Sequence, residues 1–221
     1  VSQIITGKLK KDKSQSVFSH SEFMAMAEIG VTEGAVEKQD SEIIGNLLRM
    51  ETVRVKDIMT PRTVVRLASE EQTIKDFYET AGELPFSRIP LYEGKVNEHI
   101  SGYFLKAELL ENLVQGTGEN HLSSINRDIH AVHESFPISN LFDHFMGERE
   151  HIALVVDEYG GMAGIVTMED VMETLLGIEI TDESDNTVDM QILARKNWER
   201  RARHIGLIEE NADAPGSDPT P

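Results

Sequence analysis

The sequence contains no cysteine and no long hydrophobic run. Without cysteine, neither a disulfide nor a thiolate metal site can form, and a reducing compartment is the simpler expectation. No stretch approaches the roughly 18 apolar residues of a membrane-spanning helix, and no signal peptide is visible. The chain begins at Val1 rather than at Met, so we expect it to be part of a longer protein.

Motifs for common enzyme chemistries are also missing. The sequence has no G-x-x-x-x-G-K-[ST] loop, no G-x-G-x-x-G after an expected strand and no H-E-x-x-H. His130 and His133 lie on a segment expected to be a strand, where a spacing of three residues places them on opposite faces. Ser87 and His151 have no acid to orient them as a catalytic couple. These absences predict that the chain is not an enzyme.

The chain is strongly acidic, with a net charge of −18. This balance argues against nucleic acid as a partner, because phosphate binding needs a basic face. Residues 150–194 contain eleven acidic residues and no Lys or Arg, whereas basic residues gather in 8–13 and 195–203. The acidic stretch is either a solvated surface or a surface that attracts divalent cations.

Apolar spacing predicts helices within residues 17–54, after a flexible lead-in over residues 1–16. The acidic residues of this helical segment include Glu22, Glu28, Glu33 and Glu37. Carboxylates on exposed helix faces are usually solvated, but a loose cluster of them could also hold Mg²⁺ weakly through oxygen ligands. The sequence therefore predicts an acidic helical bundle and leaves a Mg²⁺ site on it open.

An internal repeat follows, with a first unit over residues 55–118 and a second over residues 119–178. Gly102 corresponds to Gly164 and Glu108 to Asp170, each pair being 62 residues apart. Each unit has the pattern strand, helix, strand, strand, helix. Because so small a unit cannot bury both faces of its sheet, we expect the two units to pack against each other.

Beyond the repeat, residues 179–207 are expected to form an acidic linker and a helix, and residues 208–221 a disordered tail. The helix would run from about Met190 to Ile205, with its apolar residues roughly on one face. These apolar residues are Leu193, Ala194, Trp198, Ala202 and Ile205.

The segment GIVTMED, residues 164–170, joins the end of an expected strand to the start of an expected helix. Thr167 and Asp170 could simply cap that helix, because their oxygens accept hydrogen bonds from its first backbone N–H groups. A carboxylate also suits a ribose diol, and the N–H groups of a helix start suit phosphate. The residues alone leave capping and nucleotide binding both open.

Two units that each close with such a turn resemble a pair of cystathionine-β-synthase (CBS) domains, also called a Bateman module. The resemblance narrows to the CNNM/CorB/CorC family of magnesium transport proteins. It is carried by the stretches DIMTPR (57–62), FSRIPLYEG (86–94) and LVVDEYGGMAGIVTMEDVMETLLGIEITDESD (154–185). The fold that it implies is α+β: an acidic helical segment, two β-α-β-β-α CBS units packed as a Bateman module, and a C-terminal helix.

The same resemblance implies one site for ATP and Mg²⁺ between the two CBS units. Asp170 would bind the ribose, Arg88 would reach the phosphates, and Mg²⁺ would bind through those phosphates and offset the acidic side chains beside them. The implied nucleotide-binding residues are Thr60, Pro61, Arg62, Ser87, Arg88, Pro90, Ile165, Thr167, Glu169 and Asp170. The first unit has Leu105 and Glu108 where Thr and Asp would be needed, so no second site is expected there.

The function implied is that of a regulatory module on the cytoplasmic side of the cell membrane, which couples Mg-ATP binding to the membrane transport domain of the same full-length protein. The alternatives are a CBS-pair adenosine-nucleotide sensor attached to another channel or enzyme, and a scaffold with an empty cleft. We also expect a homodimer through the CBS helices. Part of the following apolar set is expected to meet the second chain, unless all of it is core: Leu141, Phe142, Phe145, Met168, Val171, Met172, Leu175 and Leu176.

Overall fold

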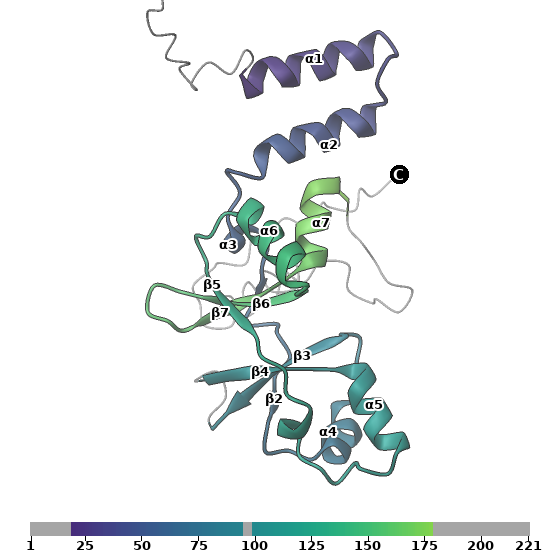
Figure 1. Ribbon diagram of the computed structural model, residues 1–221, viewed down its shortest axis with the longest axis vertical. Helices are drawn as coiled ribbons and strands as arrows, with labels where there is room; N and C mark the ends of the chain where they lie inside the picture. Colours follow the sequence, from purple (N-terminus) through teal and green to yellow (C-terminus); the bar gives the residue numbers. More distant parts are fainter. Residues whose placement is uncertain (1–18, 95–98, 179–221) are drawn as a thin grey trace, which may run out of the picture.

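A helical hairpin and two sheets follow one another along the long axis of the chain (Figure 1). The computed structural model describes residues 19–94 and 99–178. The elements are α1 (His20–Thr32), α2 (Lys38–Arg49), α3 (Val55–Ile58), β1 (Thr60–Pro61), β2 (Ala68–Ser69), α4 (Ile74–Ala81), β3 (Arg88–Glu93), β4 (His99–Leu105), α5 (Lys106–Val114), the 3₁₀ helix η1 (Leu122–Ile125), β5 (His130–His133), α6 (Ile138–Glu148), β6 (Ile152–Val156), β7 (Met162–Thr167) and α7 (Met168–Leu176). The expected lead-in, acidic linker, C-terminal helix and tail lie outside the described residues.

The lower sheet of Figure 1 belongs to the first repeat. β2 pairs in parallel with β3, and β3 pairs antiparallel with β4. Helices α4 and α5 pack against this sheet around Phe77 and Phe104, whose rings meet edge to face with centroids 5.4 Å apart. The fully buried members of this core include Ile74, Ile89, Leu91, Phe104 and Leu109. Each such side chain stabilises the fold by about 1.5–3 kcal/mol through burial.

The upper sheet has the strand order β1-β7-β6-β5, with β6 and β7 antiparallel and β5 parallel to β6. Helices α6 and α7 pack against it and share its core. The fully buried residues of this second core include Ile138, Leu141, Ala153, Val155, Val166 and Val171. The two repeats thus form two separate hydrophobic cores, as the internal repeat predicts.

The two repeats exchange their leading segments, which the sequence repeat does not reveal. Strand β1 precedes the first repeat but pairs antiparallel with β7 of the second, with Thr60 opposite Ile165. In return Arg127, which precedes β5, forms an isolated bridge with Tyr103 of β4, and the two backbones exchange hydrogen bonds of 2.8 and 3.0 Å. Each sheet is therefore completed by a segment from the other repeat, and this exchange fixes how the two units sit together.

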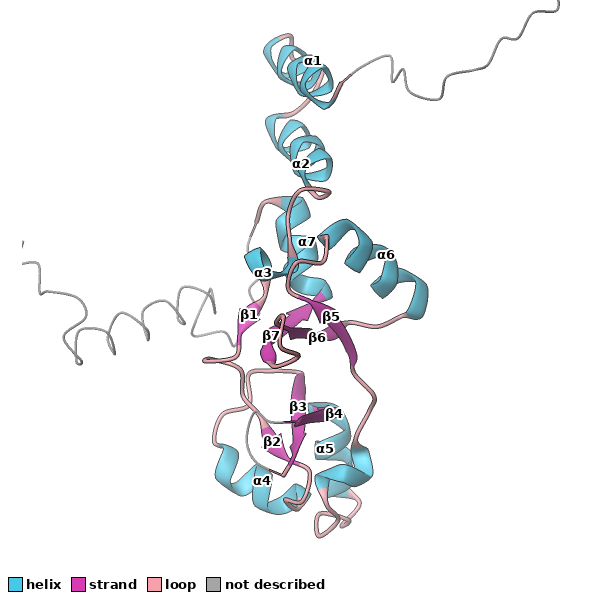
Figure 2. Cartoon of the chain, turned by 90° about the vertical axis from the view of Figure 1, so that its left-hand side faces the viewer, coloured by secondary structure: helices cyan, strands magenta, loops and turns pink. Residues whose placement is uncertain are grey.

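Helices α1 and α2 form a hairpin that packs onto the second repeat (Figures 1 and 2). Ser19 caps α1, and Glu22 returns the bond to the Ser19 backbone N–H at 2.6 Å. Hydrogen bonds from Ser19 lower the pKa of the exposed Glu22 carboxyl. Asn46 of α2 donates to the carbonyl of Leu175 at 3.2 Å. The hairpin is thereby anchored to α7, the helix that carries Thr167 and Asp170 at its start.

Much of the apolar surface considered for a dimer contact is core within one chain. Leu141, Phe145 and Val171 are at most 1% exposed, and Phe142, Met168 and Leu175 pack against the same core. For these residues the alternative of an intramolecular core is the one that the structure supports. The large exposed apolar side chains of the repeat helices are Tyr78, Leu110, Val114 and Met146. Among the described residues, no helix is both long and apolar enough to span a bilayer.

Candidate functional site

The turn from β7 into α7 is held by a reciprocal pair of caps. The Asp170 backbone N–H donates to Thr167 Oγ1 at 3.3 Å. In return the Thr167 backbone N–H and its hydroxyl donate to Asp170 Oδ2, at 2.6 and 2.7 Å. The capping interpretation is therefore correct for both residues. Because both returning bonds end on Oδ2, the geometry also fixes the direction in which the other carboxylate oxygen, Oδ1, can accept a bond from a ligand.

Asp170 pays for this position in desolvation. Its side chain is partly buried, and burial raises its pKa to about 7 in spite of the two hydrogen bonds from Thr167, which act in the opposite direction. The nearby carboxylates of Glu173 and Glu169 add a smaller upward shift. A ligand that donates hydrogen bonds to Asp170, or a cation beside it, would favour the ionised form.

Strand β1 brings the first predicted segment against this turn. Thr60 and Pro61 pair with Ile165 and Gly164 of β7. A Cβ on Gly164 would lie 2.2 Å from the Thr60 carbonyl oxygen, so only glycine allows this approach. Arg62 continues the contact, donating from its backbone N–H to the Ala163 carbonyl at 2.9 Å and from Nη1 to the Met162 carbonyl at 3.3 Å. These predicted residues therefore lie together beside the strand that leads to Thr167.

Arg88 reaches the same turn from the first repeat. It stands at the start of β3, and its Nη1 lies 3.5 Å from Glu169 Oε1 at the start of α7. The Arg88 side chain is 23% exposed and that of Glu169 is 53% exposed. The structure thus joins two predicted residues that are 81 positions apart in the sequence, one from each repeat. An ion pair across the repeats holds this guanidinium close to the Asp170 turn.

Ser87 and Pro90 flank Arg88 in the chain, but their backbone contacts lie within the first repeat. Ser87 is exposed, and its carbonyl accepts from the Lys106 backbone N–H at 2.9 Å. Pro90 is buried and lies opposite Tyr103 in the ladder between β3 and β4. Their predicted role in nucleotide binding stays a prediction.

The turn from β4 into α5 is the counterpart of the Asp170 turn, and its carboxylate already has a cationic partner. Arg127 Nε and Nη2 donate to the two oxygens of Glu108, at 3.1 and 2.5 Å. These bonds lower the pKa of Glu108. Leu105 stands at the N-cap and offers no side-chain cap. A guanidinium of the chain thus occupies the carboxylate that corresponds to Asp170, which gives a physical reason for the expectation of no second site.

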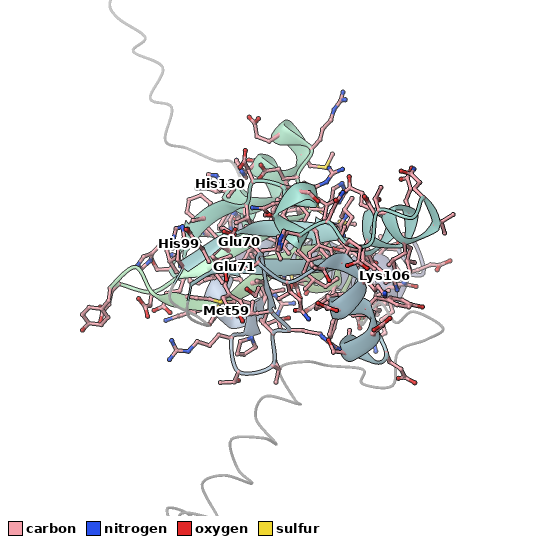
Figure 3. The ribbon with its side chains drawn as sticks, turned by 90° about the horizontal axis from the view of Figure 1, so that it is seen from below. Met59, Glu70, Glu71, His99, Lys106 and His130 are labelled. Atoms are coloured by element: carbon pink, nitrogen blue, oxygen red, sulfur yellow. The ribbon has the colours of Figure 1, made fainter. Side chains whose placement is uncertain are left out.

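Sequence analysis did not single out Arg127, Met59 or Lys106, which also lie at the two turns. Met59 Sδ lies 3.3 Å from the position of a Cβ on Gly164, and Lys106 Nζ donates to the Leu84 carbonyl at 2.9 Å (Figure 3). No motif marks these residues. Arg127 could have been found only by knowing that the leading segments exchange, because Tyr103 and Ile165 are counterparts in the repeat but their partners, Arg127 and Thr60, are 67 residues apart.

The carboxylates of the helical hairpin do not gather into a metal centre. In the part of the chain that the structure describes, no group of three or more His, Asp or Glu side chains is placed to hold a metal ion. Glu22 is engaged in the cap of α1. A weak Mg²⁺ site involving Glu22, Glu28, Glu33 or Glu37 stays a prediction.

Comparison with known proteins tests the family assignment. The CBS domain family model matches residues 122–177. The structure of the CBS domain of a bacterial CNNM/CorC family Mg²⁺ transporter is 32% identical, with a TM-score of 0.69, and the match covers 75% of this chain and 99% of that one. The chain belongs to the CNNM/CorC family. The resemblance drawn from the sequence and the α+β fold class are both confirmed.

Other members of the CNNM/CorC family add detail. A UPF0053 protein of Synechocystis is 31% identical over 92% of this chain and 58% of its own length. The magnesium and cobalt efflux protein CorC of Salmonella typhimurium is 29% identical over 82% of this chain and 62% of its own length. The chain thus spans about three fifths of these curated relatives. A CNNM/CorC CBS domain solved in complex with ATP is 33% identical, with a TM-score of 0.59 over 63% of this chain and 99% of that one.

Proposed function

We propose that this chain is the regulatory CBS module of a magnesium transporter, which binds Mg-ATP at the Asp170 turn and couples that binding to the membrane domain of the full-length protein. The observation that carries the proposal is the junction of Arg88 with the Glu169–Asp170 helix start, which assembles a cation, a carboxylate and backbone N–H groups from both repeats. The ATP complex of a 33% identical CNNM/CorC CBS domain supports it. The module would bind the nucleotide without turning it over, on the cytoplasmic side of the membrane.

The ribose would be recognised by Asp170. Thr167 holds Oδ2, so Oδ1 would accept from the ribose hydroxyls. Two donated bonds favour the ionised carboxylate and would lower its pKa from about 7, so binding would release a proton when it occurs near neutral pH. Ile165 and the Thr60–Pro61 backbone, which pair in the sheet, would flank the adenine.

The phosphates would be held by Arg88, whose forked donors suit phosphate oxygens. Arg88 lies 3.5 Å from Glu169, so the phosphates must share or displace this carboxylate. Glu169 and Glu173 would repel bare phosphate, and Mg²⁺ bound to the phosphate oxygens would offset that repulsion. The residues present therefore fit Mg-ATP better than free ATP.

A second copy of the chain and the membrane domain are the proposed partners. The exposed apolar side chains of α4 and α5, Tyr78, Leu110 and Val114, would contribute to a homodimer contact between CBS helices. The helical hairpin α1–α2 contacts α7 through Asn46, so it provides a path from the nucleotide site to whatever lies on the other side of the hairpin.

Calorimetric titration with ATP, with Mg²⁺ and in excess chelator, tests this proposal. We expect saturable binding in Mg²⁺ that is at least about tenfold weaker in chelator, because like charges then meet unshielded at the helix start. A matched titration with Arg88→Ala should lose about ten- to hundredfold in affinity in Mg²⁺. Equal affinity with and without Mg²⁺, or no binding at all, would contradict the proposal.

A further inference from the structure

We propose that residues 190–205 of this chain bind the outer side of α1 and complete the α1–α2 hairpin as a three-helix unit. These residues lie outside the described part of the chain, and their sequence pattern is that of an amphipathic basic helix. The proposal is independent of nucleotide binding, because it concerns a different surface and a different partner.

Helix α1 is apolar on two opposite sides. One side faces α2: Ala27 is buried, and a Cβ on Gly45 of α2 would lie 2.9 Å from the Met24 Cε. At about 3.6 residues per turn, three further apolar residues fall on the other side of the helix. They are Phe23, Met26 and Ile29, with exposed fractions of 51%, 53% and 57%. A helix that is apolar on two sides is typical of one that packs on both, and the described residues supply a neighbour for only the first side.

The charges of the hairpin and of residues 190–205 are complementary. Residues 20–49 hold six acidic and two basic residues, a net charge of −4. Residues 190–205 hold five basic residues and one acidic residue, a net charge of +4 with His neutral. Glu22 and Glu33 lie on the exposed side of α1, near the two ends of its apolar stripe. Lys196, Arg200 and Arg203 recur at helical spacing beside the apolar residues Leu193 and Trp198.

The chain also leaves the described structure in the right place. Ile178 follows α7, which Asn46 of α2 holds through a hydrogen bond of 3.2 Å to Leu175. Figure 1 shows α2 lying between α7 and α1. Residues 179–189 could span at most about 36 Å when extended, which is ample to pass one helix, because neighbouring helices lie about 8–10 Å apart. A 16-residue helix would measure about 24 Å and α1, with 13 residues, about 20 Å.

Tethering favours this segment over a second chain as the occupant. A short flexible linker gives an effective concentration of the order of millimolar. A segment from another copy would have to compete at the concentration of the protein itself. The apolar side of α1 would therefore be covered first by the chain's own residues 190–205.

Trp198 provides the measurement, since it is the only tryptophan in the sequence. In the full chain we expect its emission at shorter wavelength than in a peptide of residues 190–221, and its acrylamide quenching constant about threefold lower, because the indole would be packed against α1. The double variant Met26→Ser/Ile29→Ser should return both values to those of the peptide. Val114→Ser is the matched control: Val114 is 89% exposed on α5, and its loss should leave Trp198 unchanged.

A second variant pair guards against a hairpin that fails to fold. Lys196→Glu/Arg200→Glu changes only the proposed binding segment, and it should raise amide hydrogen exchange in α1 by about tenfold while leaving β6 and β7 unchanged. Trp198 values equal to those of the peptide, or exchange in α1 that does not respond to this variant, would overturn the proposal. Protection of Trp198 that is lost on dilution together with a dimer would overturn it too, because the segment would then bind a second copy.

Discussion

Replacing Asp170 by asparagine should make the ligand-free protein more stable while it weakens nucleotide binding. Asparagine keeps the shape of the side chain, and its carbonyl can still accept from the Thr167 backbone N–H, as Oδ2 does at 2.6 Å. It removes the charge whose desolvation raises the pKa of Asp170 from 3.8 to about 7. A single change therefore separates the role of the carboxylate in stability from its role in binding.

The size and the sign follow from linkage. A carboxyl whose pKa is higher in the folded state costs stability as pH rises from the unfolded value, 3.8, through the folded value, about 7. About three pKa units correspond to a ceiling of about 4 kcal/mol above pH 7. Because Asp170 retains partial contact with solvent and asparagine forfeits the charged cap, we expect a net gain of about 1–2 kcal/mol near pH 8. The gain should shrink as pH falls and disappear below about pH 4.

Thermal unfolding near pH 8 and pH 5, without nucleotide, measures this effect. We expect Asp170→Asn to raise Tm by about 3–6 °C near pH 8 and by less than half of that near pH 5. Asp76→Asn is the control, since Asp76 is likewise the third helical residue after a capping threonine, Thr73, but is exposed. A variant that is no more stable than the parent near pH 8, or a gain that does not depend on pH, would refute the reasoning about desolvation.

Three further changes test the geometry. Gly164→Ala should destabilise by about 2–4 kcal/mol in urea unfolding, since its Cβ would lie 2.2 Å from the Thr60 carbonyl oxygen; a loss under about 0.5 kcal/mol would contradict that contact. Arg127→Ala should cost about 0.5–1 kcal/mol at low salt and less in about 1 M NaCl, because Glu108 and Arg127 are partly exposed; a cost that salt does not change would argue against the ion pair. Arg127→Ala should also raise the pKa of Glu108, which NMR titration would detect.

The sequence predicts most of the fold because its repeat is local and regular. Gly102 and Gly164, 62 residues apart, mark equivalent strands, and apolar spacing locates α2 and the repeat helices around them. The exchange of leading segments is not predictable in this way. Strand β1 has only two residues, Thr60 and Pro61, and its partner Ile165 is more than one hundred positions away, so neither periodicity nor local propensity reveals the pairing.

At the site, the sequence predicts chemistry better than neighbours. Thr167 and Asp170 are adjacent on one turn, so their mutual hydrogen bonds follow from local spacing alone. The pair formed by Arg127 and Glu108 depends on the exchange between repeats, and so no spacing rule reveals it. Burial of Asp170, which raises its pKa, also depends on packing between distant segments.

Calorimetric titration of Mg-ATP into Asp170→Ala and Glu108→Ala tests the central claim most directly, because these residues hold equivalent places in the two turns. The account requires one site per chain. It expects Asp170→Ala to weaken binding by about ten- to hundredfold, since one charge-assisted contact is lost, and Glu108→Ala to change it by less than about twofold. Unchanged affinity in Asp170→Ala, a larger loss in Glu108→Ala, or two sites in the parent chain would contradict a single site at the Asp170 turn.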